Sequence, residues 1–216
     1  MGFGLLFIGY SFLVTIPYMG IDVLPNFVGF AIMIYALRKL VNHGENFRRA
    51  RFVLYFLTIW GVGITGMEIA SALYNSYCSC CYDESCYDIG FAATHLGGMR
   101  VAHFAGMAAM HYFLLMGMHR LAVDVGVAKI ARKSKRNMYF SVGFLGAQVV
   151  LMTTFAIQQF GAPLWFTSLN LILWTAMLLM NSVQIFSCYM WICYEGDEDM
   201  EKKPKNVERS YEREKK

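Results

Sequence analysis

Six apolar stretches, separated by short polar connections, constrain this chain more than any other feature of its sequence. A helix that crosses a membrane needs about 20 predominantly apolar residues. A soluble fold is excluded, because hydrophobic residues make up 57% of the 216 residues and a core of this size cannot bury so many. We therefore predict an all-α, polytopic membrane helix bundle of six transmembrane helices, with spans at roughly 3–19, 23–40, 52–73, 99–118, 138–160 and 164–194.

The positions of the basic residues predict the orientation of this bundle. The chain has nineteen Lys and Arg residues: five from the end of the second span to the start of the third, six between the fourth and fifth, and seven after the sixth. Only Arg100 remains for the opposite side. Lys and Arg accumulate on the cytoplasmic side of membrane proteins, so we expect both termini in the cytoplasm. The predicted division is one membrane domain at 1–194, a charged cytoplasmic tail at 195–216, and outer connections at 20–26, 74–98 and 160–163.

The lipid bilayer of the cell membrane is the partner that this pattern indicates. The basic residues flank helix ends, where they match anionic lipid headgroups, and no nucleic-acid partner is expected. Small residues on the third and fourth spans allow close approach between helices. They favour a homo-oligomer or another membrane partner, and they are Gly61, Gly63, Gly66, Ala102, Ala105, Gly106 and Ala109.

The segment from Gly20 to Phe30 reads Gly-Ile-Asp-Val-Leu-Pro-Asn-Phe-Val-Gly-Phe, and its apolar continuation closes with Leu-Arg-Lys-Leu at 37–40. It resembles the N-terminal hairpin of small uncharacterised multipass membrane proteins of Gram-positive bacteria, whose pattern is approximately Ile-Asp-Ile-Leu-Pro-Asp-Phe-Ile-Gly-Tyr. Asn26 and Phe30 depart from the Asp and Tyr of that pattern. The resemblance implies a bacterial plasma membrane and brings no activity with it. Because the first two stretches are short, a hairpin that re-enters without crossing is an alternative.

Glu68 is the one acidic residue well inside a predicted span, the third. An ionisable residue at membrane depth is costly and usually faces the bundle interior or a water-filled cavity. Glu68 is therefore a candidate proton or cation relay. The alternative is a side chain near the outer headgroups, or one paired with Arg100 from the fourth span.

Four of the six cysteines cluster in the predicted outer connection: Cys78, Cys80, Cys81 and Cys86. Disulfides form in that compartment, and an even cluster favours two bridges across the loop. Free thiols are one alternative. A metal site with the neighbouring acidic residues is another, although the spacing is not a paired Cys-x-x-Cys. The other two, Cys188 and Cys193, are expected to be reduced packing residues at the cytoplasmic end of the sixth span.

The fourth span carries a repeated pattern of soft metal ligands. Stepping by four residues gives His95, Met99, His103, Met107, His111, Leu115 and His119, and residues four apart lie on one helix face with a slow drift. We call this series the His/Met stripe. Its central members His103, Met107 and His111 are candidate ligands for Cu(I), which prefers thioether and imidazole. The alternative is ordinary packing, since Met fills apolar cores well.

No Ser-His-Asp, Cys-His, P-loop or metalloprotease pattern occurs in a supporting context. We therefore predict a non-enzymatic integral membrane protein with a structural, regulatory or sensory role and no cofactor. The first alternative is a small transporter or channel for protons or a soft metal ion, built on Glu68 and the His/Met stripe. The second is a membrane enzyme or redox protein that uses the outer cysteines.

Overall fold

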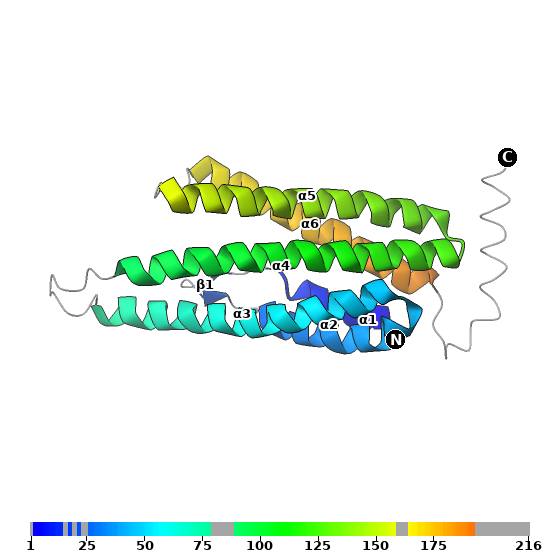
Figure 1. Ribbon diagram of the computed structural model, residues 1–216, viewed down its shortest axis with the longest axis horizontal. Helices are drawn as coiled ribbons and strands as arrows, with labels where there is room; N and C mark the ends of the chain where they lie inside the picture. Colours follow the sequence, from blue (N-terminus) through cyan, green and yellow to red (C-terminus); the bar gives the residue numbers. More distant parts are fainter. Residues whose placement is uncertain are drawn as a thin grey trace.

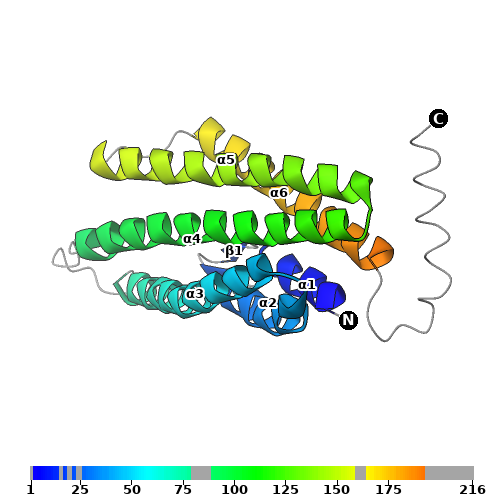
Figure 2. The same cartoon turned by 45° about the vertical axis from the view of Figure 1, so that its right-hand side comes forward.

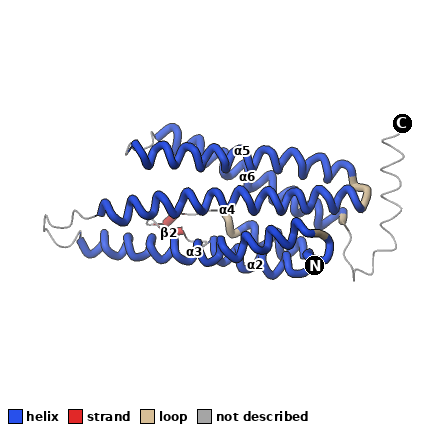
Figure 3. The backbone as a smooth tube through the Cα atoms, in the orientation of Figure 1, coloured by secondary structure: helices blue, strands red, loops and turns tan. Residues whose placement is uncertain are grey.

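A computed structural model of the chain describes residues 2–14, 17–18, 21–22, 26–78, 89–158 and 164–192. These residues form six α-helices: α1 (Gly2–Ser11), α2 (Asn26–Leu40), α3 (Glu45–Cys78), α4 (Ile89–Asp124), α5 (Ala128–Gln158) and α6 (Leu164–Trp191). A short 3-10 helix, η1 (Val41–His43), joins α2 to α3, and strand β1 (Pro17–Tyr18) pairs antiparallel with β2 (Ile21–Asp22). Helices dominate the backbone in Figure 3. For the described ranges, the prediction of an all-α protein with six helices is confirmed.

The helices form one elongated bundle (Figure 1, Figure 2). The long helices α3, α4 and α5 lie side by side, and the short α1–α2 hairpin packs beside α3 near one end. Helix α6 starts beside the far end of α5, crosses the bundle obliquely and reaches α1. The first and last helices are therefore neighbours, and buried residues of all six helices contribute to the core.

The fold gathers the basic segments at one end of the bundle. The end of α2, the start of α3, the end of α4 and the start of α5 all lie at the right-hand end of Figure 1, together with the N-terminus. Exposed Lys and Arg side chains on these segments are Arg38, Lys39, Arg48, Arg49, Arg120, Lys129, Arg132, Lys133, Lys135 and Arg136. Charges that are far apart in sequence thus share one end of the molecule.

Within the described ranges, three helices are long and apolar enough to cross a membrane. Their candidate spans are Glu45–Met67 in α3, Gly98–Asp124 in α4 and Ser168–Trp191 in α6. Helix α5 has 31 residues, but its basic start and its polar residues Asn137 and Gln148 lower its hydropathy. Helices α1 and α2 have 10 and 15 residues, short of the ~20 that a crossing needs.

Helices α3 and α4 are longer than the predicted spans 52–73 and 99–118 at both ends. Their 34 and 36 residues measure about 51 and 54 Å at 1.5 Å per residue, whereas the hydrocarbon core is ~30 Å thick. Hydropathy marks only the part of a helix that suits lipid. Good helix formers such as Glu, Arg and Ala continue the helix beyond that part.

The first apolar stretch departs most from the sequence prediction. The expected helix at 3–19 ends at Ser11, and the chain forms β1 at Pro17. Proline has no N–H for a helical hydrogen bond and disfavours helical geometry at the residue before it. Strand β2 packs against α3. The hairpin therefore consists of two short helices joined through a two-stranded turn region.

Glycines set the closest contacts between helices. A Cβ on Gly29 of α2 would lie 2.6 Å from the carbonyl oxygen of Gly9 on α1. A Cβ on Gly106 of α4 would lie 2.8 Å from Leu57 Cδ2 on α3, and one on Gly61 of α3 would lie 3.3 Å from a Cβ on α2. Part of the small-residue face of α3 and α4 is thus used within a single chain. The homo-oligomer stays a prediction.

Large apolar side chains cover much of the outside of the bundle. Phe52 and Ile59 on α3 are each 76% exposed, and Val150 on α5 and Ile172 on α6 are each 64% exposed. Soluble monomers rarely expose extended apolar patches, because such surface lowers its free energy by leaving water. A lipid bilayer provides the apolar surroundings that this surface requires.

Candidate functional site

Four polar side chains meet in the interior, one each from α1, α4, α5 and α6: Tyr10, His111, Ser141 and Asn181. Each is at most 1% exposed. We call this set the polar cluster. Buried polar groups are costly unless they are hydrogen-bonded, so their convergence from four helices gives the mostly apolar interior one set of specific polar contacts.

The hydrogen bonds of His111 fix its tautomer. Its Nδ1 lies 2.8 Å from the carbonyl oxygen of Met107, one turn earlier on α4. A carbonyl can only accept, so Nδ1 carries the proton, and in the neutral ring Nε2 is an acceptor. The Tyr10 hydroxyl, 2.7 Å away, therefore donates to Nε2. The two rings meet edge to face, with centroids 5.7 Å apart and planes at 76°.

Asn181 continues this chain of hydrogen bonds. Its Nδ2 donates both to the Tyr10 oxygen at 3.1 Å and to Ser141 Oγ at 2.8 Å. The polar cluster therefore joins Met107, His111, Tyr10, Asn181 and Ser141 in series. Asn181 Oδ1 is buried and accepts no hydrogen bond within the described part of the chain. Asn181 therefore keeps one acceptor available beside the series in the interior.

A second set of polar contacts connects α5 to α6 on either side of the cluster. Gln184 Nε2 donates to Ser134 Oγ at 2.7 Å and to the carbonyl of Ile130 at 3.2 Å. Asn137 Nδ2 donates to the carbonyl of Met180 at 3.2 Å, and Gln148 bonds to Asn170. Interhelical bonds of this kind contribute ~0.6 kcal/mol each in membrane proteins. Together they fix the register of the two antiparallel helices.

The predicted metal ligands His103, Met107 and His111 lie on α4 facing the interior. Met107 is 1% and His111 0% exposed. Both ring nitrogens of His111 are engaged in hydrogen bonds within the protein. His103 packs against Phe30 of α2, with ring centroids 5.9 Å apart, and its buried Nδ1 has no partner among the described residues.

The metal site on the His/Met stripe stays a prediction. His103 is one helical turn from Met107, and it has an available ring nitrogen, whereas His111 would have to give up Tyr10 or Met107 to bind an ion. Among the residues with described side chains, no group of three or more His, Cys, Asp or Glu could hold a metal. His119, at the basic end, hydrogen-bonds through Nδ1 to the carbonyl of Ala131 on α5 at 2.9 Å.

Several predicted site residues lie outside the described part of the structure. Glu68 falls within α3, but its side chain is not among those described, and the same holds for Cys78 at the end of that helix and for His95 on α4. The other disulfide candidates, Cys80, Cys81 and Cys86, and also Cys193, lie wholly outside the described ranges. The ion relay and the disulfides stay predictions. Cys188 is a buried free thiol on α6.

Neither Tyr10 nor Ser141 is among the site residues predicted from the sequence. A signal for Ser141 exists, because Ser134, Asn137, Ser141 and Gln148 on α5 are spaced by three, four and seven residues. That spacing places polar groups on one helix face. No comparable signal identifies Tyr10, which lies 101 positions from His111.

Comparisons of this chain with protein-family models, with curated proteins and with solved structures found no match.

Proposed function

We propose that the chain is a multi-pass integral membrane protein of the cell membrane with a structural, regulatory or sensory role rather than an enzymatic one. The observation that carries this proposal is the distribution of side chains: large apolar residues cover the outside and polar ones meet inside. The buried polar groups mainly bond helix to helix, as expected of groups that hold a bundle together. The resemblance to multipass proteins of Gram-positive bacteria favours a bacterial plasma membrane.

The orientation that we propose has both termini in the cytoplasm. Support comes from the basic residues gathered at one end of the bundle and from the cytoplasmic preference of Lys and Arg. Helices α3 to α6 cross the membrane in this arrangement. The α1–α2 hairpin enters from the cytoplasmic side and returns, because its helices measure about 15 and 22 Å, less than the ~30 Å hydrocarbon core. If α1 and α2 each crossed the membrane instead, the six crossings would also place both termini in the cytoplasm.

Reporter fusions test this topology. A reporter joined after Lys216 is expected to be cytoplasmic, and one inserted beside Asp83 is expected to be external. The measurement is the activity of a pair of reporters, one active only inside the cell and one active only outside. As a control, an insertion beside Gly126, between α4 and α5, is expected to match the C-terminal fusion. An external signal at Lys216 would overturn the proposal.

A second candidate function is transport of protons or of a soft metal ion. The specific observation that favours it is the unpartnered, buried Nδ1 of His103, one helical turn from the thioether of Met107. A permeating ion needs successive weak sites that it can enter and leave, and imidazole and thioether side chains offer such sites to Cu(I). Glu68 is the proposed relay if the ion is a proton.

Copper binding separates this candidate from the first. The variant His103→Leu/Met107→Leu keeps apolar volume and is expected to abolish Cu(I) binding by the purified protein and any copper-dependent growth phenotype. The control is His43→Leu/Met190→Leu, which removes the same two residue types from exposed positions. Calorimetry with Cu(I) in detergent is the measurement. Equal binding in both variants and the parent protein would reduce the His/Met stripe to packing.

A further inference from the structure

An open groove lies between α3 and α4 at the basic end of the bundle. It has a volume of about 450 Å³ and is lined by Arg48, Arg49, Phe52, Val53 and Phe113. Ligand sites commonly have volumes of about 300–1,000 Å³. The lining combines two guanidinium groups with three apolar side chains, and Phe52 is 76% exposed. None of these lining residues belongs to the polar cluster or to the His/Met stripe.

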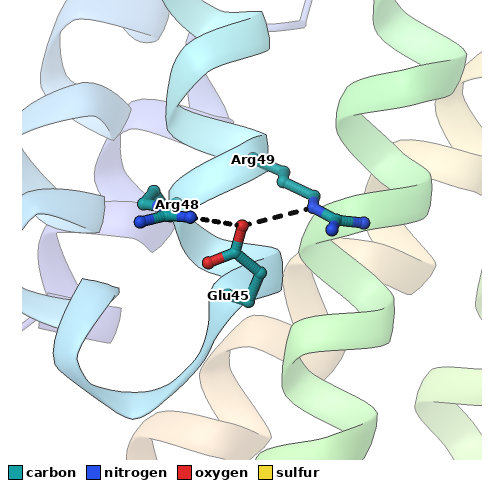
Figure 4. Close-up of polar contacts among 3 residues, drawn as sticks. All are labelled: Glu45, Arg48 and Arg49. Atoms are coloured by element: carbon teal, nitrogen blue, oxygen red, sulfur yellow. Dashed lines mark hydrogen bonds and ion pairs between the residues drawn. The ribbon is translucent and has the colours of Figure 1, made fainter.

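The charge at the groove is positive and still available for binding. Figure 4 shows Glu45 between the two arginines, with Arg49 extending toward α4. Glu45 Oε1 lies 2.8 Å from Arg48 Nη2 and 3.4 Å from Arg49 Nε. A guanidinium carries five N–H donors, so one carboxylate occupies only a small part of their capacity. The side chains of Arg48 and Arg49 are 64% and 57% exposed.

We propose that this groove binds one anionic phospholipid. The phosphate group lies on Arg48 and Arg49, whose planar guanidinium groups match phosphate oxygens in paired hydrogen bonds. An acyl chain lies along Phe52, Val53 and Phe113. This inference rests on the proposed membrane location, which places the start of α3 at headgroup level. Glu45 holds the two guanidinium groups near each other and leaves the site with one net positive charge.

The order of residues along α3 supports a lipid rather than a soluble anion. The two arginines precede Phe52 and Val53 in the direction that leads from the basic end toward the middle of the bundle. A phospholipid has the same order, with a charged phosphate followed by apolar chains. A free phosphate would leave the apolar part of the groove unused.

Native mass spectrometry of the purified protein in detergent tests the site, with dioleoyl phosphatidylglycerol and dioleoyl phosphatidylcholine as probes. The parent protein is expected to retain phosphatidylglycerol in preference to phosphatidylcholine. Arg48→Gln/Arg49→Gln is expected to bind phosphatidylglycerol about 30-fold more weakly, because it removes the charge-assisted hydrogen bonds of two guanidinium groups to the phosphate. The matched control Lys135→Gln/Arg136→Gln removes the same charge from exposed positions on α5 that do not line the groove, and it is expected to change binding less than about twofold, because salt screens distant exposed charges.

A second variant tests the apolar part of the groove. Val53→Trp fills it and keeps both arginines, so loss of phosphatidylglycerol binding supports a seated acyl chain. Equal losses of phosphatidylglycerol binding in the two charge variants would indicate diffuse attraction and overturn the site. Undiminished phosphatidylglycerol binding to the Val53→Trp protein would also overturn it. So would equally tight binding of glycerol phosphate, which has no acyl chains, to the parent protein. Flotation of the parent protein with vesicles separates the two proposals. A protein that floats but does not discriminate between lipids overturns only the groove, whereas one that stays soluble without detergent overturns the membrane location as well.

Discussion

Gly29→Ala is expected to lower the free energy of unfolding by about 2 kcal/mol, because the added methyl group overpacks the α1–α2 contact. A Cβ at this position would lie 2.6 Å from the carbonyl oxygen of Gly9 and 2.7 Å from the Cβ of Phe12. Both atoms belong to or directly adjoin the backbone of the first apolar stretch, so they can move only if α1 moves. The expected fall in melting temperature is about 4–8 °C for a chain of this size.

Gly143→Ala is the matched control on α5. Nothing lies within 4 Å of a Cβ built on Gly143, and alanine favours a helix over glycine by up to ~1 kcal/mol. The same chemical change is therefore expected to raise stability at Gly143 and lower it at Gly29. Thermal unfolding in detergent measures both. A stabilising effect of Gly29→Ala would show that α1 and α2 are not in close contact.

The sequence was sufficient to predict the class of fold and the approximate positions of the helices. Apolar stretches such as 52–73 and 164–194 exceed the length of a buried strand, and their composition suits helices in lipid. The helix ends were less predictable. Helix α3 begins at Glu45 and α5 at Ala128, within charged segments where hydropathy does not indicate the end of a helix. There the helix propensity of Glu, Arg, Lys and Ala determines where the helix begins.

The first apolar stretch shows where hydropathy alone is misleading. Its mean composition favours a helix through Met19, but Pro17 cannot donate a backbone hydrogen bond and disfavours a helical residue before it. The resulting turn region pairs Pro17 with Asp22. Pro17 disfavours helix only in the residues just before it, whereas α1 already ends at Ser11. Proline therefore accounts for only part of the shortening.

The candidate site was predictable only in part. His111 and Asn181 are recognisable as polar residues in apolar helices, but the sequence does not reveal that Tyr10 joins them. That contact depends on the oblique path of α6 and on the position of α1 beside it, and both are set by tertiary packing. The His/Met stripe lies on one long helix, as predicted, whereas two contacts of its imidazoles come from neighbouring helices: Tyr10 beside His111 and the aromatic ring of Phe30 beside His103.

Tyr10→Phe is expected to lower the free energy of unfolding by about 1–3 kcal/mol, because the hydroxyl serves two partners. Its removal leaves His111 Nε2 without a donor and one N–H of Asn181 without an acceptor, both fully buried. The aromatic ring and its packing remain. Tyr139→Phe on α5 is the control, since Tyr139 is 63% exposed, and it is expected to have almost no effect on thermal unfolding in detergent.

The double variant Tyr10→Phe/His111→Leu distinguishes a specific hydrogen bond from general packing. Replacing both partners of a buried bond by apolar groups is less damaging than leaving one of them unpaired, so the double variant is expected to lose less stability than the sum of the two single variants. Contacting residues typically show such coupling at about 0.5–3 kcal/mol. Interhelical bonds in lipid average only ~0.6 kcal/mol, because helices that separate in a membrane find other polar partners. Additive losses would mean that Tyr10 and His111 act independently, and that α1 is held against α4 by apolar packing alone.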